Sequence, residues 1–342
     1  MLLPPSRGAI SAGLLTALRR DAHAIAALPV PRSADPLADD DLQLSLWICY
    51  ELHYRGFSDA GSGWEWEPSL LALRARLEAE FLAGLRRAVP AVPASSDATI
   101  EPALWRMTNE DNGPSLSGYL QRQASLDQFQ EFLIHRSIYH LKEADPHSWA
   151  IPRLDSAAKA ALLEIQYDEY GGGSAPRMHA ELFRSTLREV GLDDRYGHYL
   201  PRVPGMTLAI SNLISFFGLH RRWRGALVGH LAAFEMTSSV PNRKYSRGLA
   251  RLGGSATARR FFDEHVEADA VHEQLAVHDL CGALVRAEPQ LGADVLFGAA
   301  CCLHLDAQFA CSVLACWQRG SSSLYPGDTD RAKDLVLEIS AS

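Results

Sequence analysis

The stretch that most constrains the fold of this chain is FFDEHVEADAVHEQ, residues 261–274, which carries His265, Asp269 and His272. Steps of four and then three residues return to one face of an α-helix. The stretch has no proline or glycine, and its apolar residues recur at helical intervals, so it predicts a helix. Such a polar face either meets water, as charged helical faces usually do, or meets partner residues from other segments.

The spacing within this face also bears on how many metals it suits. At about 1.5 Å rise per residue, the two imidazoles of His265 and His272 lie roughly 10 Å apart along the helix axis. With Asp269 between them, they suit two neighbouring metals better than one. The face therefore predicts a two-metal site, provided that other helices supply further ligands.

Composition excludes several other classes of protein. The net charge of −8 and the absence of a dense Lys/Arg run argue against a nucleic-acid partner. The longest nearly uncharged apolar run, residues 295–303, is shorter than the roughly 20 residues that span a bilayer, so we expect no membrane partner. The N-terminus lacks a basic start before its apolar part, which predicts no signal peptide and a cytoplasmic protein.

The apolar pattern predicts an all-α fold. Val, Ile and Thr never accumulate in alternating runs, so no sheet is indicated. We expect helices over 68–89 and 116–142, and a long central helix within 282–317. An amphipathic stretch at 10–28 is expected to be peripheral, and 89–102 is expected to be a loop because of its prolines.

The cysteines indicate no metal or redox site of their own. None of the six forms a C-x-x-C pair, which argues against a zinc ribbon or a thioredoxin-type site. We expect the four within 295–317 to be small buried hydrophobes. The chain also lacks a cysteine quartet for an iron–sulfur cluster and a dinucleotide fingerprint, so a redox reaction would need an external electron donor.

A second candidate segment, residues 160–192, carries Glu169 and His179 on either side of three glycines and a proline. In an unbroken helix these two side chains would lie about 15 Å apart, too far for metals that sit roughly 3.5–4 Å apart. Consecutive glycines followed by proline can end one helix and start another at an angle, which would fold both side chains toward one point. The alternative is a plain interhelical loop.

A third segment, residues 221–245, holds Glu235 in an otherwise apolar, Ala-rich helix. An isolated carboxylate there is costly to bury unless it is paired or bound to a metal. We expect Pro241 to end this helix, with Arg243 in the exit turn. Arg243 could pair with a substrate carboxylate or cap the helix carbonyls. Farther on, Asp306 is expected to have a structural role only.

Together the three segments offer three carboxylates and three imidazoles, a ligand set that suits a non-haem di-iron or di-manganese centre. Ferritin-like proteins usually offer Glu-x-x-His twice, and this chain does not. A ferritin-type bundle therefore fits poorly.

The three motifs resemble those of the haem-oxygenase-like di-metal oxidases and oxygenases, also described as iron-containing redox enzymes. The resemblance covers roughly 115–320 and rests on DEYGGG-x5-H (168–179), AAFE-x5-PNR (232–243) and DEHVEADAVHE (263–273). It implies the metal ligands Glu169, His179, Glu235, His265, Asp269 and His272. Some members use one further upstream carboxylate, for which Glu143 is the nearest match.

What the resemblance implies can be stated as expectations. The fold is a haem-oxygenase-like helical bundle over 111–342, with additional N-terminal helices over 1–110 that assist formation of a homodimer. Two irons per chain are bound, with manganese an option at one site, and O2 is the co-substrate. The substrate is a small amine or amino-acid derivative in a natural-product pathway, and the reaction is N-oxygenation or oxidative C–C cleavage.

Two other classes stay open. A cofactorless or non-redox enzyme on the same fold would not need six convergent ligands, and the metal content of the purified protein separates it. An iron-binding protein without turnover would be distinguished by its O2 consumption after anaerobic loading with Fe(II).

Overall fold

The structure, a computed structural model, describes residues 1–89, 97–110 and 113–327, with the backbone alone for 97–99 and 269–270. Every regular element within these residues is a helix and none is a strand, which confirms the all-α prediction. The N-terminal helices are α1 (Ala9–Leu18), α2 (Asp40–Glu51) and α3 (Pro68–Ala88). The bundle that follows consists of α4 (Asp97–Asn109), α5 (Leu116–Arg122), α6 (Leu126–His140), α7 (Ser156–Glu169), α8 (His179–Glu189), α9 (Gly205–Leu219), α10 (Arg224–Met236), α11 (Ser239–Arg251), α12 (Ala256–Gln274), α13 (Ala283–Ala287) and α14 (Gly292–Gln318).

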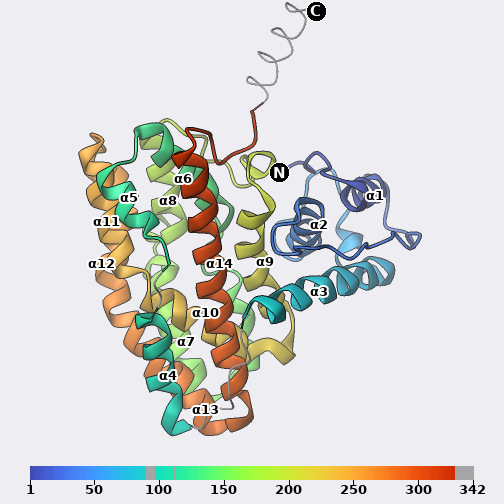
Figure 1. Cartoon of the computed structure of the whole chain (residues 1–342). Helices are drawn as coiled ribbons and strands as arrows, with labels where there is room; N and C mark the ends of the chain where they lie inside the picture. Colours follow the sequence, from blue (N-terminus) through green and yellow to red (C-terminus); the bar gives the residue numbers. More distant parts are fainter. Residues whose placement is uncertain (90–96, 111–112, 328–342) are drawn as a thin grey trace, which may run out of the picture.

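The long helix α14 runs through the middle of the bundle, as predicted for the C-terminal segment (Figure 1). It packs against α9 and α10 on one side, while α11 and α12 lie together along the opposite edge (Figure 1). The segment Pro289–Gln318 is long and apolar enough to cross a membrane by length and composition alone, although the apolar-run criterion predicted no such helix. Its residues Leu305, Phe309 and Val313 are buried in the bundle, so core packing accounts for part of its apolar composition.

Two glycines let α10 and α14 touch through their backbones. A Cβ on Gly229 would lie 1.8 Å from the Val295 carbonyl oxygen, and one on Gly298 would lie 1.9 Å from the Ala226 carbonyl oxygen. Neither obstacle is a flexible side chain, so only glycine fits at both positions. This contact fixes α10, which carries Glu235, against the central helix.

The N-terminal helices share the hydrophobic core of the bundle. A single cluster of buried apolar residues extends from Leu3 to Leu324. Leu14 and Leu18 of α1 are fully buried, so the first part of the stretch predicted to be peripheral contributes to this core, whereas residues 19–28 are exposed or half-buried. The carboxylate of Asp41, in the first turn of α2, accepts the N–H groups of Ile10 and Ser11 at 2.8 Å and thereby caps α1. A domain boundary at residue 110 and a role of these helices in dimerisation stay predictions.

Three helix boundaries differ from those predicted from the sequence. Helix α4 begins within the predicted loop 89–102 and contains Pro102, because burial of Ile100 and Leu104 outweighs the lost hydrogen bond. Pro241 lies in the first turn of α11, where its missing N–H costs little, rather than ending α10. The expected helix over 116–142 is two helices, because Ser125 and Gln128 form a capping box that starts α6.

The prediction for the cysteines of α14 holds for two of the four. Cys301 and Cys302 are buried, whereas Cys311 is exposed and Cys316 is half-buried. Composition alone cannot assign a helix face, so the burial of a whole apolar segment was overestimated.

Gly298→Ala should destabilise the fold, because the new methyl group meets the backbone of α10. We expect a loss of about 1–3 kcal/mol or more in the free energy of unfolding, measured by urea denaturation of the metal-free protein. Gly61→Ala is the matched control, since no atom lies within 4 Å of a Cβ there and its φ of −68° suits alanine. Equal stability of the two variants would contradict the close approach of α10 and α14.

Candidate metal centre

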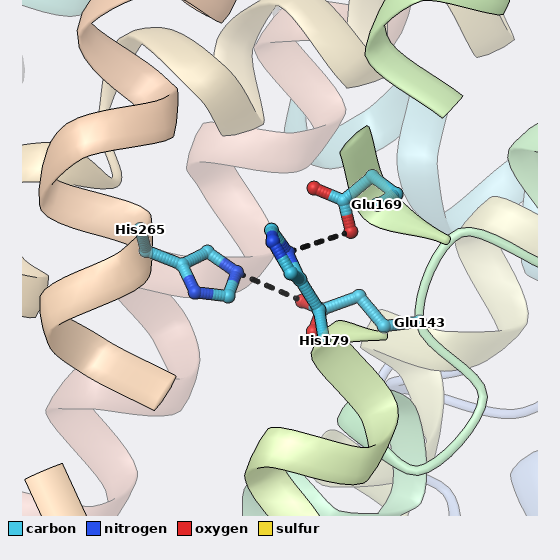
Figure 2. A group of neighbouring side chains, drawn as sticks. All are labelled: Glu143, Glu169, His179 and His265. Atoms are coloured by element: carbon cyan, nitrogen blue, oxygen red, sulfur yellow. Dashed lines mark ion pairs between the residues drawn. The ribbon is translucent and has the colours of Figure 1, made fainter. Parts of the chain in front are cut away.

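One group of buried ligand-type side chains lies where four elements meet. Glu143, Glu169, His179 and His265 each offer one ligand atom, and these atoms all lie within 4.8 Å of one another. In Figure 2, His265 of α12 points across at His179, with Glu143 and Glu169 beside it. Glu169 is the last residue of α7 and His179 the first of α8, while Glu143 lies in the turn that follows α6.

A second group shares one carboxylate with the first. Glu169, Glu235 and His272 place their ligand atoms within 4.8 Å of one another, and all three side chains are buried. Glu235 comes from the last turn of α10 and His272 from α12. Because Glu169 belongs to both groups, the arrangement has the form of two neighbouring sites joined by one carboxylate.

The glycine turn between α7 and α8 brings Glu169 and His179 together, as the sequence predicted. Gly171, Gly172 and Gly173 have φ of 67°, 60° and 79°, a region that glycine adopts without strain. A Cβ on Gly171 would lie 2.5 Å from the backbone of the following turn. The chain therefore doubles back, and Glu169 Oε2 lies 3.1 Å from His179 Nδ1.

Helix α12 turns its polar face inward. His265 Nε2 lies 3.7 Å from Glu143 Oε1, and His272 Nδ1 lies 3.5 Å from Glu235 Oε2. The buried hydroxyl of Thr186 on α8 donates to the Ala258 carbonyl of α12 at 2.9 Å, which ties the two helices together. The alternative of a solvated stripe is therefore wrong for His265 and His272, both of which are buried.

Hydrogen bonds on the outer side of each α12 histidine orient its ring. His265 Nδ1 donates to the Phe261 carbonyl at 2.7 Å, which leaves the Nε2 lone pair facing the cluster, where a metal could bind it. His272 Nε2 lies 3.2 Å from Asp168 Oδ2, which leaves Nδ1 toward Glu235. Pairing of the outer nitrogen with a carbonyl or carboxylate is typical of metal-binding histidines.

Several buried polar atoms of the two groups lack hydrogen bonds within the described part of the chain. They are Glu143 Oε2, Glu169 Oε2, His179 Nδ1 and His272 Nδ1. The imidazoles and carboxylates lie near one another, but they are not aligned for a normal hydrogen bond. Buried polar atoms of this kind need a partner, and a cation between them would supply it, so these residues fit a metal.

The charges of the cluster agree with this interpretation. Burial disfavours the charged form of Glu169, yet the neighbouring His179 holds the pKa of its carboxyl below the usual range. Burial likewise lowers the pKa of His272, but Glu235 and the other carboxylates raise it to about 9. The cluster thus stabilises positive charge at its centre, which a divalent cation can provide in place of protons.

The turn that carries Glu143 is held by the N-terminal segment, a feature that the sequence did not reveal. Lys142 is 2% exposed, and its Nζ lies 3.4 Å from Glu51 Oε2 and 4.3 Å from the ring centroid of Tyr54. Tyr196 also donates to Glu51 at 2.6 Å. The residue directly before Glu143 is therefore anchored to α2.

The far side of the turn is anchored as well. Ala144 has a φ of 71°, a left-handed conformation that is strained for alanine. Its carbonyl accepts from Gln166 Nε2 of α7 at 3.1 Å. Asp145 accepts from the Tyr170 hydroxyl at 2.8 Å and pairs with Arg55 at 3.6 Å. These contacts hold the strained turn, which aims Glu143 into the first group.

For two of the residues predicted from the sequence, the structure does not test the predicted role. Asp269 lies on α12 between the two histidines, but its side chain lies outside the described residues, so its role as a ligand stays a prediction. Arg243 is exposed on α11, and it does not line the cavity that His140 and His265 border next to the metal centre. Its role toward a substrate also stays a prediction.

An all-α bundle that encloses a buried cluster of carboxylates and imidazoles has the architecture of non-haem metalloproteins. Residues 130–307 match the family model described as iron-containing redox enzyme, and the chain belongs to that family. It is also 26% identical over 147 residues to a nitrosourea synthase of Streptomyces achromogenes subsp. streptozoticus. That match covers 43% of this chain and 31% of the relative, so the chain spans about a third of the relative's length.

Lys142→Met should destabilise the protein strongly, because it leaves Glu51 buried without its cation. We expect a loss of about 3–5 kcal/mol in the free energy of unfolding of the metal-free protein, with partial recovery in the double variant Lys142→Met/Glu51→Gln. Lys159→Met, at a half-buried lysine of α7, is the control and should change stability by less than about 0.5 kcal/mol. A Lys142 effect no larger than the control would contradict the anchoring of this turn.

Proposed function

We propose that this protein is a non-haem di-iron oxygenase that uses O2 to oxidise a small amine or amino-acid derivative at nitrogen. The observation that carries the proposal is that Glu169 belongs to two buried groups of ligands at once. Two metals bridged by one carboxylate are typical of di-iron proteins built in helical bundles. Membership in a family of iron-containing redox enzymes supports iron as the metal.

In this proposal Glu143, His179 and His265 would hold one iron, Glu235 and His272 would hold the other, and Glu169, which belongs to both groups, would be available to each. Asp269 would complete the second site, and manganese is the alternative metal at one position. The bound pair would supply the redox chemistry that activates O2. Oxygen and nitrogen ligands of this mixed kind suit iron and manganese better than softer metals.

The reaction class follows from the comparison with the relative. That protein is named for making a nitrosourea, a compound that contains oxidised nitrogen, which favours N-oxygenation over C–C cleavage. In the balanced step, an N–H group becomes N–OH and the second oxygen atom leaves as water. Two electrons come from the substrate, and two more arrive with two protons from an external donor. We infer an external electron donor because the sequence lacks a cysteine quartet for an iron–sulfur cluster and a dinucleotide fingerprint.

The chain's own residues exclude water and fix the ligands. Phe261 packs on His265 with ring centroids 4.3 Å apart, and Phe183 and Phe261 both lie 5.0 Å from the ring of His140. His140 in turn contacts Glu143 through its Nδ1 at 2.6 Å. Aromatic cover of this kind keeps bulk water from the reacting atoms and strengthens the electrostatic interactions inside.

Iron content tests the shared carboxylate. After anaerobic loading with Fe(II) and desalting, the protein should hold about two irons per chain, whereas Glu169→Ala should hold almost none. His272→Ala should keep about one, because it belongs to only one group. The matched control is Glu164→Ala, an exposed carboxylate on the same helix, which should keep both. Equal iron in Glu169→Ala and His272→Ala would contradict the bridging role.

Turnover is tested separately from binding. The Fe(II)-loaded protein should consume O2 when a chemical reductant and a suitable amine are present, and the hydroxylated amine should appear in the products. Full iron content without O2 consumption would favour an iron-binding protein without turnover. Lack of iron after loading would favour a cofactorless enzyme on this fold.

A further inference from the structure

A cavity of about 70 Å³ reaches the metal centre from the side of α14. This is several times the roughly 10–15 Å³ that a single water needs. His140 and His265 line this cavity, and both contact Glu143. Helices α6, α8, α10, α11, α12 and α14 all contribute residues to its wall. A molecule in this cavity would therefore lie directly against the first group of ligands.

Aromatic side chains form one part of the wall. Phe132, Phe183, Phe234, Tyr245 and Phe262 all line the cavity. The ring of Tyr245 lies 4.7 Å from that of Phe132 and 5.6 Å from that of Phe262. Burial raises the pKa of the Tyr245 hydroxyl to about 12, so it stays neutral. Such walls suit a flat or apolar chain.

The only ion pair among the cavity's described lining residues joins Arg136 and Asp306. Arg136 Nη2 lies 2.9 Å from Asp306 Oδ1, and the two side chains are 14% and 55% exposed. The Arg136 guanidinium also lies 4.9 Å from the ring centroid of Phe309 and 5.6 Å from that of Phe132. Because the Asp306 side chain is 55% exposed, the pair lies where the cavity meets solvent, one turn of α6 away from His140, and the rings hold the arginine in place.

The charges of this pair decide which ligand it can accept. A lone carboxylate that bound Arg136 would displace Asp306 from its partner, and a lone amine that bound Asp306 would do the same to Arg136. Arg136 is 14% exposed and therefore costly to leave without a partner, whereas a lone carboxylate on Arg136 would lie beside the Asp306 carboxylate and be repelled by it. A zwitterion replaces both partners at once, because its carboxylate pairs with Arg136 and its ammonium group with Asp306.

We propose that Arg136 and Asp306 bind the α-amino-acid head of the substrate, whose side chain runs along the aromatic wall toward His265. The group that is oxidised then lies at the far end of that side chain. The identity of the reacting end rests on the proposed function, whereas recognition of the head group does not require iron. The sequence alone assigned Asp306 only a structural role, since Arg136 lies 170 positions away from it.

Three matched probes test the head group on the full-length protein. They are L-homophenylalanine, 4-phenylbutanoate, which lacks its amine, and 3-phenylpropylamine, which lacks its carboxylate. Calorimetric titration under argon, with and without Fe(II), should show that the amino acid binds at least about tenfold more tightly than either analogue. Equal affinities of the three probes, or no binding of the amino acid at millimolar concentration, would overturn the proposal.

Variants assign the preference to these two residues. In Arg136→Leu and in Asp306→Asn, homophenylalanine should bind no more tightly than the analogues. Asp306 is the more exposed of the pair, so its amide variant keeps the test valid if Arg136→Leu unfolds. Arg76→Leu, at an exposed arginine of α3, is the matched control and should keep the full preference.

Two further outcomes separate the inferences. Retention of the preference in Asp306→Asn, or its loss in Arg243→Leu alone, would overturn the assignment to this pair. If the metal-free protein shows the preference but Fe(II) loading fails, the proposed function fails and the head-group site stands. If iron binds as expected but the preference is absent, only the head-group site fails.

Discussion

Mutual repulsion among buried carboxylates is the constraint that the rest of this structure has to satisfy. Glu143, Glu169 and Glu235 come from three separate elements; Glu143 and Glu169 lie within reach of His179 and His265, and Glu169 and Glu235 lie within reach of His272. Without compensating positive charge, such a cluster would drive the helices apart. The glycine turn after α7, the backbone contact of α10 with α14 and the inward face of α12 all hold these groups together. Binding of cations is the direct way to relieve the cost of that arrangement.

The N-terminal segment also helps to hold Glu143 in the cluster. Glu51 and Arg55 belong to α2 and the turn after it, and they anchor Lys142 and Asp145 on either side of Glu143. A left-handed alanine between those anchors is tolerated because the surrounding contacts determine its conformation. The segment before residue 130 lies outside the part that matches the family, yet it supports a residue of the centre. Its removal would therefore affect more than the shared apolar core.

The sequence predicted the helices best where periodicity was long and uninterrupted. The segment 68–89 became α3 within one residue of its expected end. The predicted helix boundaries were wrong where a proline was taken to interrupt a helix and the packing around it was not considered. This was the case for Pro102 inside α4 and for Pro241 in the first turn of α11. Proline forbids one hydrogen bond, but burial of neighbouring apolar residues or a place in the first turn offsets that loss. Packing, which a local pattern does not contain, decided these cases.

What the sequence determined by itself was ligand chemistry. The spacing of His265 and His272 and the glycines after Glu169 follow from local backbone geometry, and both features predicted the convergence of these residues. The resemblance offered Glu143 only as the nearest match to an upstream carboxylate, and tertiary structure decided that it faces the same point and that Arg136 meets Asp306 at the mouth of a cavity. Those relations join side chains from separate elements, including two far apart along the chain. They depend on how whole helices pack rather than on any local pattern of residues.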